Sequence, residues 1–161
     1  MPKITSQVDV DAPVEVLWTL AQDVKRFPQI MPDLDGLDVL EESETGPQKR
    51  RTVTHWKARI KQLGRKLEWV EEDIWDGEAR TCSFWQIRGD LTAYSGVWKF
   101  APQGEGKSRA DLELEYKLEI PLVGAMMQKV VQKLVQENCD GMLGALKTEA
   151  EKEARNGTSG E

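Results

Sequence analysis

Apolar and polar residues alternate in several stretches of the first 120 residues, a pattern typical of β-strands that are buried on one face. The clearest stretch is Ala110–Ile120, where apolar or aromatic residues alternate strictly with charged ones. Pro121 ends this strand because proline has no N–H to donate. Further strands are predicted at Ile4–Val10, Leu37–Glu44, Arg50–Lys61, Lys66–Asp76, Arg80–Arg88 and Ala93–Phe100.

Helical patterns follow the first strand and close the chain. Pro13 suits the first turn of a helix, and Asp11 and Glu15 favour its positive end. A second, short helix or turn is predicted at Val24–Met31, where prolines interrupt the pattern. The last helix is long and amphipathic, and it is predicted from about Leu122 to Ala154.

These elements predict how the chain folds. Every strand after the first connects to the next by a short turn, so the sheet should be antiparallel. One of its faces is apolar and therefore covered, and the closing helix is the only large apolar body that can cover it. We expect an α+β fold in which a curved antiparallel sheet of about seven strands wraps around the C-terminal helix. Residues 1–154 would form one domain and residues 155–161 a flexible tail.

A single polar residue, Asn138, lies near the centre of the apolar stripe of the long helix. A buried amide without a partner costs roughly 1–3 kcal/mol. The Asn138 side chain should therefore either bond a strand edge or point into a cavity that holds a polar group. The stripe consists of Val123, Met127, Val130, Val131, Leu134, Met142 and Ala145.

Composition narrows the location and the partners. The 161 residues contain 39% hydrophobic ones, and no run approaches the ~18 apolar residues of a membrane span. Residues 1–10 lack the pattern of a secretory signal, so we expect a cytoplasmic protein without stable membrane insertion. A net charge of −6 argues against DNA as a partner. A single histidine and two separated cysteines provide no zinc site, and no cofactor motif is present.

The positive charge is concentrated in one hairpin, Lys49–Lys66. No acidic residue occurs between Pro47 and Leu67. In the predicted strand, His55 shares a mostly cationic face with Arg51, Lys57, Arg59 and Lys61. This face can be a solvated one that is paired with acids on neighbouring strands. It can also steer an anionic ligand, a membrane surface or a ribosomal partner. The basic residues are Lys49, Arg50, Arg51, Lys57, Arg59, Lys61, Arg65 and Lys66.

Two carboxyl groups, Glu71 and Asp73, are the candidates for chemistry. They share strand parity with Trp69, so they point inward if this tryptophan does. A carboxyl group in an apolar pocket has a raised pKa and can act as a general acid or base. A bulge that inverts the parity would turn Glu68 and Glu72 inward instead.

Several motifs resemble one known group of proteins. They are Val8-x-Val10-x-Ala12-Pro13-x-x-Val16-x-Trp18, Asp23-x-x-x-Phe27-Pro28, Glu68-Trp69-Val70 and Asn138-x-x-x-Met142-Leu143-x-x-Leu146-Lys147. With the order of elements, they are similar to the helix-grip fold of the START and birch-pollen-allergen superfamily. The resemblance is to its polyketide cyclase/dehydrase and coenzyme Q-binding branch. It implies a cavity between sheet and helix for a lipid, a quinone or a polyketide-like aromatic molecule.

The resemblance also assigns positions and shows departures. It implies that Asn138 and Trp69 are pocket residues and that Tyr94 and Trp98 line the cavity. Where aromatic polyketide cyclases carry two arginines and a tyrosine, this chain has Asp73, Gln86 and Leu34. These departures argue against the same cyclisation.

The sequence therefore predicts a protein that binds a hydrophobic small molecule, for transport or presentation. The alternative is a cyclase/dehydratase-like enzyme that uses Asp73 or Glu71. A third hypothesis is a protein or ribosome contact through the Lys49–Lys66 hairpin. The predicted binding residues are Trp56, Trp69, Asp73, Gln86, Tyr94, Trp98, Tyr116, Met127, Val131, Leu134, Asn138 and Met142.

Overall fold

A computed structural model describes residues 2–119 and 124–159. The strands are β1 (Lys3–Val10), β2 (Leu34–Gly46), β3 (Lys49–Ile60), β4 (Arg65–Asp76), β5 (Thr81–Gly89), β6 (Ala93–Pro102) and β7 (Ser108–Lys117). The helices are α1 (Val14–Gln22), α2 (Phe27–Ile30) and α3 (Ala125–Ser159), with short 3₁₀ turns η1 (Val24–Arg26) and η2 (Lys61–Leu63).

The seven strands form one antiparallel sheet in the order β1-β7-β6-β5-β4-β3-β2. Consecutive strands from β2 to β7 are neighbours, and β1 closes the far edge beside β7. This topology follows from the short turns that join the strands. The predicted α+β helix-grip fold is therefore confirmed.

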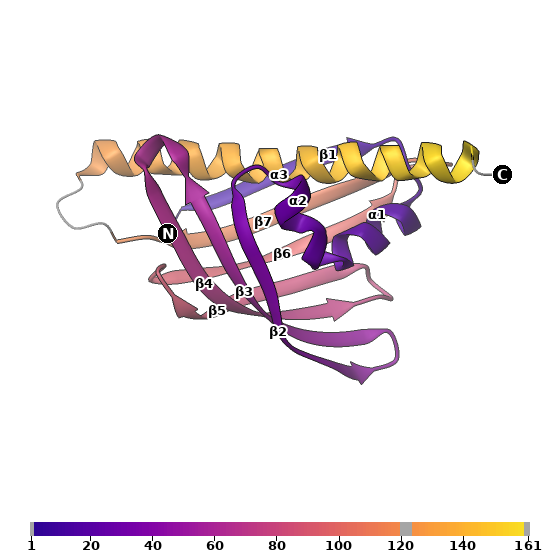
Figure 1. Cartoon of the computed structure of the whole chain (residues 1–161), viewed down its shortest axis with the longest axis horizontal. Helices are drawn as coiled ribbons and strands as arrows, with labels where there is room; N and C mark the ends of the chain where they lie inside the picture. The colour runs from indigo at the N-terminus through magenta and orange to yellow at the C-terminus, as the bar shows by residue number, and fades with distance from the viewer. Residues whose placement is uncertain (1, 120–123, 160–161) are drawn as a thin grey trace.

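Helix α3 lies along one side of the curved sheet, and α1 and α2 lie beside it (Figure 1). It is fixed to the β1 edge by polar contacts: Ser6 Oγ donates to Asp140 at 2.5 Å, and Gln136 Nε2 donates to the carbonyl of Thr5 at 2.9 Å. Leu143 and Leu146 of α3 are buried in the core that fills the space between helix and sheet. Strand β1, at the edge of the sheet, thus holds α3 in place.

Among the described residues, the predicted boundaries differ from the observed ones by more than two residues in three places. Strand β7 begins at Ser108 and ends at Lys117, earlier than predicted, and β2 begins at Leu34. Helix α3 continues to Ser159, so the predicted end at Ala154 was too early. The predicted start at Leu122 lies outside the described residues. The last turns of α3 are polar, and helical periodicity of apolar residues gives no signal for them.

In the described part of the chain, no helix is both long enough and apolar enough to cross a membrane.

Helix α3 contains a glycine whose replacement should stabilise the protein. A Cβ atom built on Gly144 meets no atom within 4 Å outside the helix backbone. Glycine in a helix interior costs roughly 0.5–1 kcal/mol relative to alanine. We therefore expect Gly144→Ala to raise the free energy of unfolding by about that amount in urea titrations. An unchanged or lower free energy of unfolding would mean that this position requires glycine.

Candidate functional site

A cavity of about 120 Å³ lies between the inner face of the sheet and α3. This volume is well above the roughly 10–15 Å³ that one water molecule needs. Its walls come from six strands, from the link between α2 and β2, and from α3. The lining residues are Met31, Pro32, Asp33, Leu34, Trp56, Ala58, Ile60, Leu67, Trp69, Glu71, Phe84, Leu91, Tyr94, Trp98, Leu112, Leu114, Tyr116, Leu118, Val135, Asn138, Cys139, Gly141 and Met142.

Most of the predicted binding residues are brought together in this lining. The strand residues among them lie on the face of the sheet that the alternating pattern predicted to be buried. Whether they contact a ligand stays a prediction. The predicted residues in the lining are Trp56, Trp69, Tyr94, Trp98, Tyr116, Asn138 and Met142, together with the candidate acid Glu71.

Five predicted residues do not line this cavity. Met127 is 42% exposed, because the first turns of α3 are not covered by other parts of the described structure. Val131 and Leu134 are buried in the core instead.

The other two residues lie on strands. Gln86 donates to the carbonyl of Leu91 at 2.7 Å, and its buried Oε1 has no partner among the described residues. Asp73 lies behind Glu71, beside a second and smaller cavity.

Stacked aromatic rings form one wall of the cavity. The indoles of Trp56 and Trp69 are parallel within 7°, with ring centroids 5.8 Å apart. Tyr94 lies 5.3 Å from Trp69 and 5.3 Å from Phe84 between ring centroids. A Cβ atom on Gly96 would come within 2.6 Å of Phe84 Cζ, so only glycine lets this ring lie flat on β6. Such rigid, planar surfaces suit a planar or chain-like apolar ligand.

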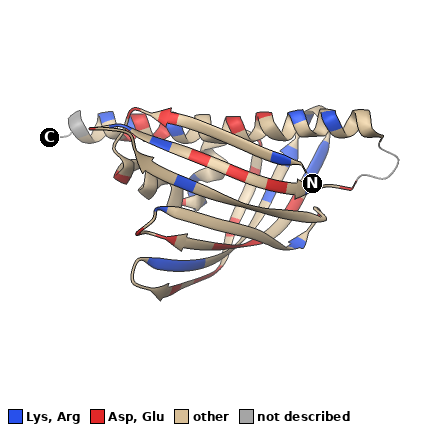
Figure 2. Ribbon diagram, turned by 180° about the vertical axis from the view of Figure 1, so that it is seen from behind, with Lys and Arg blue, Asp and Glu red and all other residues tan. Residues whose placement is uncertain are grey.

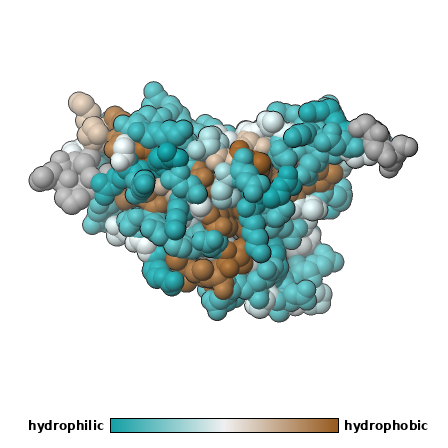
Figure 3. Space-filling model, viewed as in Figure 1, coloured by the Kyte–Doolittle hydropathy of each residue, from teal (hydrophilic) through white to brown (hydrophobic). Residues whose placement is uncertain are grey.

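The mouth of the cavity lies between the α2–β2 link and α3. Pro32 and Gly141 line the cavity and are exposed, whereas Asn138 is half-buried beside them. Figure 3 shows hydrophobic residues between hydrophilic ones in the middle of the face that carries α2 and β2. The Asn138 amide makes no hydrogen bond to another described residue. Asn138 thus lines the cavity, and its contact with a polar group stays a prediction.

Glu71 and Asp73 both point to the inside, where each is 3% exposed. The register between β3 and β4 has no shift, and the irregularity at Val70/Glu71 lies on the β5 side. The parity of β4 is therefore not inverted. Glu68 and Glu72, the alternative pair, lie on the outer face of the strand.

Two threonines hold the Asp73 carboxyl group from the neighbouring strand. Thr52 Oγ1 lies 2.9 Å and Thr54 Oγ1 2.7 Å from Asp73 Oδ2. The indole N–H groups of Trp75 and Trp56 donate to the same two hydroxyl oxygens at 3.0 and 2.8 Å. Because the indoles can only donate, each threonine hydroxyl is free to donate its own proton to Asp73.

The Glu71 carboxyl group is the protonated partner of this pair. Burial raises its pKa well above the usual value, and the hydrogen bond to Asp73 raises it further. Trp69 Nε1 donates to Glu71 Oε1 at 2.8 Å, and this hydrogen bond lowers the pKa of Glu71. Burial also raises the pKa of Tyr94, with a further contribution from Glu71. A hydrogen bond between two carboxyl groups requires a proton, and the raised pKa assigns it to Glu71, which borders the cavity.

The two cysteines are buried thiols. Burial raises the pKa of Cys139 to about 12, and it raises the pKa of Cys82 well above its usual value. Both thiols are therefore uncharged near neutral pH and poor nucleophiles. In this fold they act as small hydrophobic residues.

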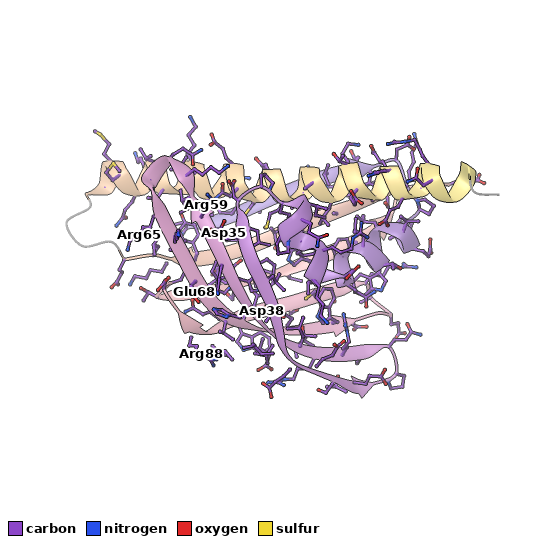
Figure 4. All side chains as sticks on the ribbon, viewed as in Figure 1. Asp35, Asp38, Arg59, Arg65, Glu68 and Arg88 are labelled. Carbon is purple, nitrogen blue, oxygen red and sulfur yellow. The ribbon has the colours of Figure 1, made fainter. Side chains whose placement is uncertain are left out.

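The basic face of β3 lies on the outer surface, where most of its charges are paired. In Figure 2, blue and red segments both mark the strands of the sheet, and in Figure 4 the labelled Asp35 and Arg59 lie close together. In the described residues, Lys49, Lys57, Arg65 and Lys66 have no acidic partner. The ion pairs are Arg50–Glu42, Arg51–Glu72, His55–Glu68, Arg59–Asp35 and Lys61–Asp33, with N–O distances from 2.5 to 3.8 Å.

Sequence reasoning missed part of the lining. Leu112 and Leu114 have the inward parity that the alternation of β7 predicts, so they could have been included. Val135 and Cys139 lie on α3, where periodicity cannot distinguish residues that face the cavity from those that pack on strands. The link of residues 31–33 has no periodic pattern that marks it as lining, and Leu34 was marked only by the resemblance, as the position of a tyrosine in aromatic polyketide cyclases.

Comparison with known proteins agrees with this architecture. A family model described as "Polyketide cyclase / dehydrase and lipid transport" matches residues 10–143. The chain belongs to this family. The predicted recognition of the START-like, polyketide cyclase/dehydrase branch is thereby confirmed.

Individual relatives share the fold over most of their length. The crystal structure of TTHA0849 from Thermus thermophilus is 33% identical, with a TM-score of 0.82 over 92% of this chain and 97% of that one. The Zhui aromatase/cyclase from a Streptomyces species is 18% identical, with a TM-score of 0.81 over 94% of each chain, and shows the shared fold. The ribosome association toxin RatA of Pseudomonas aeruginosa is 29% identical over 115 residues, which cover 71% of this chain and 74% of RatA.

The raised pKa of Glu71 predicts a specific pH dependence of stability. The folded protein keeps a proton that the unfolded chain loses above about pH 4.3. Stability should therefore fall as pH rises from there to the folded-state pKa, by up to about 1.4 kcal/mol per pH unit. Glu71→Gln keeps the shape but cannot ionise, so its stability should fall less between about pH 5 and 8.

Urea titrations at several pH values measure this difference. Glu72→Gln is the matched control, because its side chain lies on the outer face of the same strand. If the stability of wild type and Glu71→Gln changed in parallel with pH, Glu71 would not hold the extra proton.

Proposed function

We propose that this protein binds a hydrophobic small molecule in the cavity between the sheet and α3, for transport or presentation. The cavity of about 120 Å³ is the observation that carries this proposal. Filling such a space with side chains would stabilise the core, because voids cost dispersion contacts. An open hollow with rigid aromatic walls is what a ligand site needs.

The character of the walls supports an apolar ligand with few polar groups. Aromatic and aliphatic side chains make up most of the lining, and the polar exceptions are few. The Asn138 amide at the mouth offers both a donor and an acceptor to a ligand. The description of the family includes lipid transport as well as polyketide cyclisation.

Binding is favoured over catalysis by the environment of the two carboxyl groups. Thr52 and Thr54 hold Asp73, and Glu71 lies between Asp73 and the cavity. Such bonds fix a carboxylate and leave it few lone pairs for a substrate proton. An acid/base role in a cyclase or dehydratase is the alternative, and it would require Glu71 to exchange its proton with a bound substrate.

A variant that fills the cavity tests the binding proposal. Ala58 lines the cavity, whereas Lys57 beside it is exposed on the opposite face of β3. Nile red is uncharged and fluoresces strongly in apolar surroundings. We expect wild type and Lys57→Trp to bind this dye alike, and Ala58→Trp to lose at least about tenfold in affinity. Equal binding by all three proteins would contradict a site in this cavity.

Ribosome contact is a second candidate function, favoured by the similarity to RatA. Lys57 and Lys66 on the outer face have no acidic partner in the described structure and are free to meet phosphate groups. Reversing both to glutamate should abolish co-sedimentation with ribosomes. Reversing Lys129 and Lys133 on α3 changes the charge equally and serves as the control. Co-sedimentation that is the same in both double variants would exclude this hairpin.

A further inference from the structure

The charges around the cavity are all of one sign. Among the described residues, its lining contains the acids Asp33 and Glu71 but no lysine, arginine or histidine. Asp33 at the mouth has a partner outside the lining, since its Oδ1 lies 3.8 Å from Lys61 Nζ. Glu71 has none, because its polar neighbours are an indole N–H and another carboxyl group.

The negative charge below the cavity is also isolated from cations. Thr52 and Thr54 give Asp73 hydrogen bonds without a formal charge. The guanidinium of Arg50 lies over the ring of Trp75, 5.2 Å from the ring centroid. Arg50 is paired with Glu42, at 2.6 Å. The side chains of β5, β6 and α3 that border the cavity add one thiol, one hydroxyl and one amide, and none of them is basic.

We propose that the cavity selects its ligand by charge: it accepts an apolar molecule whose polar group is an uncharged hydrogen-bond donor, such as a hydroxyl, and excludes carboxylates and phosphates. This inference rests on the proposed function, since it names the class of ligand for the same cavity. A hydroxyl group can donate to Glu71 or to Asn138, which both reach the lining.

An anionic group would meet two costs that a hydroxyl avoids. It would lose its hydration on entering an apolar space, and no cation in the described lining would compensate. It would also be repelled by the charge that Glu71 and Asp73 share, and this repulsion is stronger in a buried site than in water. A hydroxyl needs one hydrogen bond, and the site supplies acceptors.

Decanol and decanoate provide a matched pair of probes, because they have the same chain length and differ in the charge of the head group. We expect decanol to displace Nile red at pH 7 with a Kd at least about tenfold lower than that of decanoate. Comparable or tighter binding of decanoate would overturn the charge selection and leave ligand binding intact. Decanol that fails to displace the bound dye would also overturn it. If neither the dye nor either probe binds, the proposed function itself fails, and this inference falls with it.

Two variants locate the origin of the selection. Asp73→Asn removes the buried charge, so decanoate should gain affinity about tenfold while decanol changes little. Glu71→Gln leaves the Asp73 carboxyl group in place and should keep the preference for decanol. Glu72→Gln on the outer face is the control and should behave as wild type. A preference that persists in a folded Asp73→Asn protein would contradict the assignment to this pair. If Asp73→Asn does not fold, the comparison of the two probes on wild type still decides the proposal.

Discussion

The inner face of this sheet is larger than one helix can cover, and the site depends on that mismatch. Seven strands spaced at roughly 4.8 Å span about 30 Å, whereas a helix with its side chains is only about 10–12 Å wide. Contacts such as Ser6–Asp140 hold α3 near the β1 edge, so the middle of the sheet lacks a helix above it. Large aromatic side chains occupy part of this space, and the remainder is the cavity. A further helix or strand would be needed to fill this space completely.

The pair of carboxyl groups shows how the protein tolerates charge in such an apolar space. Two ionised carboxylates could not remain side by side there, so Glu71 keeps its proton and Asp73 accepts the hydroxyls of Thr52 and Thr54. Every donor in this network is uncharged. In the described lining, no lysine, arginine or histidine faces the pair. Under the proposed function, the two carboxyl groups would give an apolar cavity a means of discriminating between head groups.

The alternation of residues along the strands predicted most of this architecture, because burial on one face fixes the parity of a strand. The alternation put Glu71 on the same face as Trp69, and the resemblance to the family placed Trp69 and Tyr94 inside. The residues of α3 that face the cavity were harder to predict, because apolar residues of a helix follow the same period whether they face strands, the cavity or solvent. Met127 was misplaced for that reason, because its distance from the sheet is a tertiary feature. Gln86 has the expected strand position, but its amide is turned to the Leu91 carbonyl, which no pattern reveals.

The tryptophans allow the most direct test of the central claim, that an uncharged apolar ligand occupies this cavity. Trp56, Trp69 and Trp98 line it, whereas Trp18 does not and Trp85 is 38% exposed. We would record the indole N–H signals by ¹H–¹⁵N NMR during a titration with decanol. The account predicts that the signals of Trp56, Trp69 and Trp98 move while those of Trp18 and Trp85 stay. Movement confined to Trp85, or no movement at saturating decanol, would contradict it.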